Sequence, residues 1–188
     1  MTNALLICAC LCVVACLYAW RWPPHATLST HIDIDATPEQ IWELLGQPAS
    51  YPNWNPFIVS MQGHLAVGQQ LVNVMQPTGK RTMTFKPRLL AVDAPHELRW
   101  RGRLLVPGLF DGEHFFELHR NANGTQLHHG EKFSGLLLWL INVETFRQDF
   151  ERMNAALKIA SESLSKKMPS HAIQTSIYHA GIKKPPKA

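Results

Sequence analysis

A helix start followed at once by an aromatic and proline-rich segment constrains this chain more than any other feature. Thr37 stands directly before Pro38 and three residues before Gln40, which is the spacing of a capping box. We therefore expect a helix that begins at Pro38. Gly46 and Pro48 would end it within three turns, and a helix this short is stable only when it packs against a larger structure.

The segment after this helix carries three aromatic side chains and two prolines, namely Tyr51, Pro52, Trp54, Pro56 and Phe57. Because the prolines fix the backbone, we expect irregular structure here. The aromatic rings would bury a large apolar area. Two interpretations fit: a lid or entrance packed over an apolar cavity, or core aromatics that close one end of a domain.

Seven runs rich in β-forming residues predict strands, and glycines and prolines separate them. The runs are 31–36, 57–62, 70–76, 81–93, 97–105, 113–120 and 125–134. Strands that follow one another through short turns form an antiparallel meander, which can face a core on one side and water on the other. Residues 23–30, which include Pro23 and Pro24, predict a short stiff linker before the first strand.

A long amphipathic helix is expected after the last strand. Apolar residues recur at spacings of three and four along Val143, Phe146, Phe150, Met153, Leu157, Ala160 and Leu164. Charged residues fill the positions between them, so this stripe is a packing surface for the sheet. A curved antiparallel sheet gripping a C-terminal helix is the predicted architecture, in the α+β class.

Five segments of the chain together resemble the START-like, or SRPBCC, superfamily of polyketide cyclases and dehydrases, ubiquinone-binding proteins and lipid-transfer domains. The segments are 36–42, 51–56, 100–102, 112–116 and 129–136. The resemblance implies the helix-grip fold over residues 31–168. It also implies a cavity between the sheet and the C-terminal helix that holds a hydrophobic small molecule or lipid.

The last hairpin suggests a polar site. Asn123-Gly124 is typical of a two-residue type I′ turn, which would place Ala122 opposite Thr125. The predicted facing pairs are Leu118–His129, Phe116–Glu131 and His114–Phe133. His114, His129 and Glu131 would then point inward among apolar neighbours, close enough to interact.

Three interpretations of this trio are open: a hydrogen-bonded cluster, a polar anchor for the head group of an apolar ligand, or an acid–base pair for cyclase or dehydratase chemistry. Their spacing is not a metal motif, and the folded part lacks cysteine, so we expect no metal site. The chain carries no recognisable cofactor-binding motif, and we expect no cofactor. Binding or transport is favoured over catalysis, and a non-catalytic interaction module is a further alternative.

The expected lining of the cavity is Trp42, Trp54, Phe57, Phe85, Trp100, His114, Phe116, His129 and Glu131, with Trp54 and Phe57 as a gate.

Residues 4–20 carry no charge, and a membrane helix within residues 1–22 is expected. A cleaved signal peptide, a lipoprotein signal acylated at Cys16 and a buried helix are the alternatives. Arg21 directly follows the apolar run, which favours a single-pass protein with a cytoplasmic domain.

Residues 169–188 predict a flexible basic tail. Five lysines and no acid occur after residue 165. Such a tail can touch anionic lipids or simply keep the chain soluble, and we expect no nucleic-acid partner. On the strands, Arg99, Arg101 and Arg103 predict an outer solvated stripe, with His119 and His128 on the same outer face.

Overall fold

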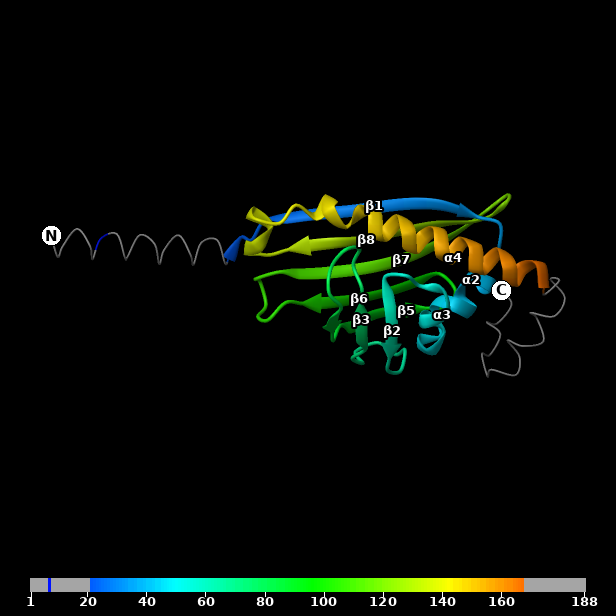
Figure 1. Ribbon diagram of the computed structural model, residues 1–188, viewed down its shortest axis with the longest axis horizontal. Coiled ribbons are helices and arrows are strands. Elements are labelled where there is room, and N and C mark those ends of the chain that lie inside the picture. The colour runs from blue at the N-terminus through cyan, green and yellow to red at the C-terminus, as the bar shows by residue number, and fades with distance from the viewer. Residues whose placement is uncertain (1–6, 8–20, 168–188) are drawn as a thin grey trace, which may run out of the picture.

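The computed structural model describes residue 7 and residues 21–167, and it shows an α+β fold with a large antiparallel sheet and a long C-terminal helix (Figure 1). The elements are β1 (His25–Ile34), α2 (Pro38–Leu45), η1 (Pro48–Ser50), α3 (Tyr51–Trp54), β2 (Ile58–Gln62), β3 (Val72–Met75), β4 (Met83–Phe85), β5 (Arg88–Asp93), β6 (Glu97–Arg103), β7 (Asp111–Asn121), β8 (Gly124–Ser134), η2 (Leu136–Trp139), η3 (Val143–Phe146) and α4 (Arg147–Lys167). The helix-grip prediction is confirmed: α4 packs along β1 and β8 and also contacts α2 and α3.

The short helix α2 forms as its sequence predicts. The Thr37 backbone N–H donates to Gln40 Oε1 at 2.8 Å, and the Gln40 N–H donates to Thr37 Oγ1 at 3.4 Å. Gly46 ends the helix, with its N–H donating to the Trp42 carbonyl at 2.7 Å. Ile41 is fully buried, so α2 gains its stability from the core.

The aromatic segment is more regular than predicted, because residues 51–54 form the single helical turn α3. The hydroxyl of the buried Tyr51 donates to the Leu45 carbonyl at 3.2 Å and joins the turn to α2. Asn55 ends the turn, since its side-chain oxygen accepts from the backbone N–H groups of Phe57 and Ile58. Pro52 suits this turn because prolines fit the first positions of a helix.

Strand β1 begins six residues earlier than predicted. Residues 25–30, expected as a linker, pair with β8 from His25 opposite Ser134 onward. The linker prediction was wrong because Pro23 and Pro24 restrict only their own backbone and that of the residue before each, so residues 25–30 can form a strand. The Pro24 carbonyl already accepts from the Gly135 N–H at 3.1 Å, so hydrogen bonding to the rest of the fold begins at the second proline.

The strands form two sheets, not one meander. The large sheet has the order β1-β8-β7-β6-β5, and the small sheet has the order β2-β3-β4. The run 81–93, predicted as one strand, divides at Pro87 into β4 and β5. A proline has no N–H to donate to a neighbouring strand, which explains the break.

The β7–β8 hairpin has a different register from the one predicted. The observed pairs include Leu118–Leu127, Phe116–His129, His114–Glu131 and Gly112–Phe133. Asn121 lies opposite Gly124, so Ala122 and Asn123 form the turn. Neither of them has the positive φ that a type I′ turn requires; Gly124 has it instead, at 136°. The shift is two residues, so every side chain keeps its predicted face.

The predicted single-pass membrane location is corrected by the structure. Within residues 21–167 and at Ile7, no helix combines the length and apolar character that crossing a bilayer requires. The apolar segment behind the prediction, residues 4–20, lies outside the described residues except for Ile7, and so does the basic tail from residue 168 onward.

Candidate functional site

A cavity of about 300 Å³ lies between the two sheets and α4. Its wall is built from β2, β3 and β4 on one side, β6, β7 and β8 on the other, and Phe146 and Phe150 from the C-terminal helices. Apolar side chains make up most of this wall. The loop after β3 closes one side, because Thr78 donates through its N–H and hydroxyl to the buried Asp149 of α4.

Five of the nine predicted lining residues reach the cavity wall: Phe57, Phe85, Trp100, His114 and Glu131. The other four lie elsewhere. Trp42 and Trp54 pack against the core outside the cavity, and Trp54 Nε1–H donates to Ser50 Oγ at 3.3 Å. Phe116 and His129 are buried behind the wall, where their rings stack with centroids 4.6 Å apart. Of the predicted gate, Phe57 lines the cavity and Trp54 does not.

The predicted polar trio forms a chain of hydrogen bonds that runs from the cavity into the core. Glu131 Oε2 lies 3.3 Å from His114 Nδ1, and His114 Nε2 lies 3.0 Å from His129 Nε2. His129 Nδ1 lies 2.6 Å from Asn154 Oδ1 on α4, and Asn154 Nδ2 lies 2.8 Å from Thr30 Oγ1 on β1. Glu131 and the buried His114 line the cavity, and His129, Asn154 and Thr30 are buried behind them.

The buried end of the chain fixes the direction of the hydrogen bonds. Thr30 has a single hydroxyl hydrogen, which it donates to the His129 backbone carbonyl at 2.9 Å. Thr30 Oγ1 must therefore accept from the amide NH₂ of Asn154, which turns Asn154 Oδ1 toward His129. His129 Nδ1 consequently carries a hydrogen and donates it to Asn154.

The same reasoning fixes the donor and the acceptor of the remaining hydrogen bonds toward the cavity. A neutral His129 that is protonated on Nδ1 has a bare Nε2, which accepts from Nε2–H of His114. A neutral His114 in turn has a bare Nδ1 facing Glu131. The chain is complete when Glu131 is protonated and donates to that nitrogen.

The pKa values agree with this arrangement. Burial raises the pKa of Glu131 to about 8 and lowers the pKa of His114 to about 3. The pKa of His129 is also lowered, first by burial and then by the charge that His114 would carry. At neutral pH the three groups are therefore uncharged, with one proton shared between Glu131 and His114.

Neighbouring residues hold this pair in place. Trp100 stacks on His114 with ring centroids 4.8 Å apart and planes 5° apart. Gly112 makes room for the carboxyl group, because a Cβ there would lie 1.9 Å from Glu131 Oε1. Glu131 keeps 18% of its side chain accessible through the cavity. The pair is thus rigid and still open to a ligand.

Sequence reasoning missed the role of Asn154 and Thr30 in this chain. Asn154 follows Met153 on the apolar stripe of α4 and is buried. A polar residue on the buried face of a helix is the signal that would have revealed it, because buried amides need partners. Arg103, predicted on the outer stripe, lines the cavity together with Lys80.

The arrangement of a curved sheet, a C-terminal helix and a largely apolar cavity between them defines a ligand-binding domain of the helix-grip, or SRPBCC, class. Residues 25–162 match the family described as polyketide cyclase / dehydrase and lipid transport, and the chain belongs to this family. A search of curated protein sequences finds no match.

Solved structures with low sequence identity share the fold. A protein from Rhodobacter sphaeroides is 19% identical with a TM-score of 0.60, over 73% of this chain and 93% of its own. The major latex-like protein 151 from Panax ginseng is 14% identical with a TM-score of 0.62, over 72% and 96%. The di-domain ARO/CYC StfQ of the steffimycin biosynthetic pathway is 8% identical with a TM-score of 0.58, over 76% and 51%. These similarities establish the fold alone.

Proposed function

We propose that this domain binds and carries a hydrophobic small molecule or lipid in the cavity between its two sheets and α4. The observation that carries the proposal is the apolar wall ending in the Glu131–His114 pair. Ligand sites are typically concave and apolar with a few placed polar groups, and 300 Å³ is at the lower end of their usual volume. Family membership supports the same function.

The pair selects the polar group of the ligand. Because the Glu131 proton is directed at His114 Nδ1, the other carboxyl oxygen, Oε1, is free to accept a hydrogen bond. That oxygen lies over Gly112, which also lines the cavity. A hydroxyl group on an otherwise apolar molecule is the best match, since its hydrogen would meet Oε1 without disturbing the buried chain.

Gly102 provides the test. It lines the cavity, and a Cβ added there would meet no atom within 4 Å. Gly102→Phe should therefore fill the cavity without distorting the fold, while Gly102→Ala adds one methyl group and serves as the matched control. Native mass spectrometry of the full chain, followed by solvent extraction, would measure co-purified ligand.

We expect ligand on the wild type and on Gly102→Ala, and none on Gly102→Phe, with unchanged circular dichroism. A domain that carries no ligand and takes up no lipid, quinone or sterol from a mixed extract would refute the proposal. Strong destabilisation by Gly102→Phe would instead indicate a filled core and favour a non-catalytic interaction module.

A second candidate is cyclase or dehydratase chemistry, favoured by the contact between a protonated carboxyl group and an imidazole at the cavity wall. Enolisation and dehydration need one group that accepts a C–H proton and one that protonates oxygen. Glu131 would supply both: it gives its proton to the oxygen and accepts the C–H proton in exchange, while His114 holds the carboxyl group in place. Incubation with a poly-β-keto thioester should then give a cyclised product that Glu131→Gln abolishes without loss of ligand binding. Unchanged thioester with the wild type would remove this candidate.

A further inference from the structure

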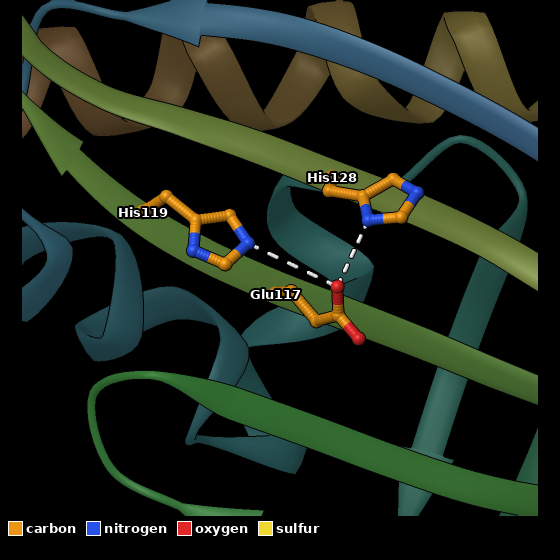
Figure 2. A group of neighbouring side chains, drawn as sticks. All are labelled: Glu117, His119 and His128. Atoms are coloured by element: carbon orange, nitrogen blue, oxygen red, sulfur yellow. Dashed lines mark hydrogen bonds and ion pairs between the residues drawn. The ribbon is translucent and has the colours of Figure 1, made fainter.

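The outer face of the β7–β8 hairpin carries a second cluster, on the opposite side of the sheet from the cavity. Figure 2 shows His119 and His128 both directed at one carboxylate oxygen of Glu117. His128 Nδ1 lies 2.8 Å from Glu117 Oε2, and His119 Nε2 lies 3.9 Å from the same atom. Glu117 and His128 are direct cross-strand partners, and His119 is two residues further along β7, so all three share a face.

The three donor atoms are spaced for a single ion. All of them lie within 4.8 Å of one another. Zinc binds imidazole nitrogen and carboxylate oxygen at about 2.0–2.2 Å, so ligands of one tetrahedral ion stand about 3.4 Å apart. The observed 2.8 Å and 3.9 Å bracket that value. His119 has 62% of its side chain exposed and is free to close the remaining gap by rotation.

The neighbours already orient two of the ligands. His128 Nδ1–H donates to Glu117 Oε2 at 2.8 Å, and a bound metal ion would replace that hydrogen. His128 Nε2 lies 2.7 Å from Ser29 Oγ, which would then accept the hydrogen on Nε2 and hold the ring in place. His31 stacks on the His128 ring at 4.3 Å with planes 12° apart. The other carboxylate oxygen of Glu117, Oε1, accepts from Arg99 at 2.8 Å. A ligand ring and a ligand carboxylate are thus fixed from outside, as metal ligands usually are.

Charged side chains of both signs surround the cluster on the outer face. Three carboxylates, those of Glu97, Glu113 and Glu117, surround the two guanidinium groups of Arg99 and Arg101. Lys132, the cross-strand partner of Glu113, balances the third carboxylate, so the geometry of the three ligands, and not a net negative charge, supports a metal ion.

We propose that Glu117, His119 and His128 form a binding site for a divalent first-row transition metal ion of the zinc class. Imidazole and carboxylate ligands suit such ions, and the solvent side of the cluster leaves room for water as a further ligand. The sequence prediction of no metal rested on the spacing of the inner trio and on the lack of cysteine in the folded part, and it placed His119 and His128 on the outer face without further role.

Zinc titration of the full chain by calorimetry tests the site, with Zn²⁺ as the probe and no affinity tag present. Cys8, Cys10, Cys12 and Cys16 are replaced by serine, because thiolates would bind zinc themselves. The test variants are His119→Ala, Glu117→Gln and Ser29→Ala. His64→Ala, which removes an exposed histidine outside the cluster, is the matched control.

We expect one equivalent of Zn²⁺ bound by the parent and by His64→Ala, and that equivalent lost in His119→Ala and Glu117→Gln. Ser29→Ala should weaken binding by about tenfold, since it removes the partner that orients His128. His119 is exposed, so its replacement leaves the fold intact, and far-ultraviolet circular dichroism checks this. Equal zinc stoichiometry in the parent and in both ligand variants would overturn the proposal, and so would binding only in the millimolar range.

Discussion

Replacing Glu131 by glutamine should change how the stability of the domain depends on pH. The folded carboxyl group has a pKa of about 8, against an ordinary value of 4.5 for the unfolded chain. Below pH 4.5 both states hold the proton, and its contribution to stability is complete. As pH rises, the unfolded chain releases a proton that folded Glu131 retains, so the contribution of Glu131 to stability falls until pH reaches about 8.

The size of the effect follows from the two pKa values. Each pH unit between them costs about 1.4 kcal/mol of unfolding free energy, so the full span from pH 4.5 to 8 amounts to about 5 kcal/mol. The figure of about 5 kcal/mol is an upper value, because 18% of the Glu131 side chain is accessible and water in the cavity can lower the cost of ionising the carboxyl group. Glu131→Gln keeps a donor for His114 Nδ1 and has no proton to release, so it lacks this slope.

The assay is urea unfolding followed by tryptophan fluorescence for the wild type and Glu131→Gln at pH 5.5, 6.5 and 7.5. Over that range the variant should gain about 2–3 kcal/mol relative to the wild type. Glu113→Gln is the control: burial opposes ionisation of Glu113, but hydrogen bonds from Arg101 and Arg99 keep its pKa low, so its removal should give a constant offset. Parallel pH profiles for the wild type and Glu131→Gln would refute a buried, protonated Glu131.

Three further substitutions probe the same structure. Asn154→Leu leaves the buried Nδ1–H of His129 without an acceptor and should cost about 1–3 kcal/mol in urea unfolding; no loss would contradict a buried hydrogen bond between His129 and Asn154. Gly112→Ala should displace the Glu131 carboxyl and flatten the pH profile described above, whereas an unchanged profile would argue against the close packing at this position. Thr37→Ala removes the helix cap and should cost about 1 kcal/mol in thermal unfolding, and an unshifted midpoint would contradict this.

Local signals were enough to predict α2 and α4 from the sequence. The capping residues of α2 act within three positions of one another, and the apolar stripe repeats along α4 from Phe150 onward, although its first two residues, Val143 and Phe146, lie in η3. The division into two sheets was not predictable in the same way. It depends on which strands pair across the fold, and only the break at Pro87 is indicated by the local sequence.

The sequence correctly predicted which face of the β7–β8 hairpin carries the inner polar residues, but it predicted the wrong pairing register of the two strands. The turn was placed at Asn123 and Gly124, yet Gly124 is the first paired residue of β8 because only its backbone suits a φ of 136° and the close approach of the Ile34 carbonyl. The error of two residues preserved the side-chain alternation, so His114 and Glu131 still faced inward. Asn154 was missed because the sequence does not show which helix residue reaches a histidine on the sheet.

The β7–β8 hairpin holds two histidine–glutamate pairs, and the strand alternation gives them opposite properties. His114 faces Glu131 and His128 faces Glu117 in the same ladder, but the pairs are three residues apart and so lie on opposite faces. On the inner face burial dominates, the pKa of Glu131 rises to about 8, and the pair is neutral. On the outer face the contacts with His128 and Arg99 outweigh burial and hold the pKa of Glu117 below its ordinary value. The inner pair therefore suits an uncharged polar group on an apolar ligand, and the outer pair, in which Glu117 accepts from His128 Nδ1–H, suits a cation that replaces that hydrogen.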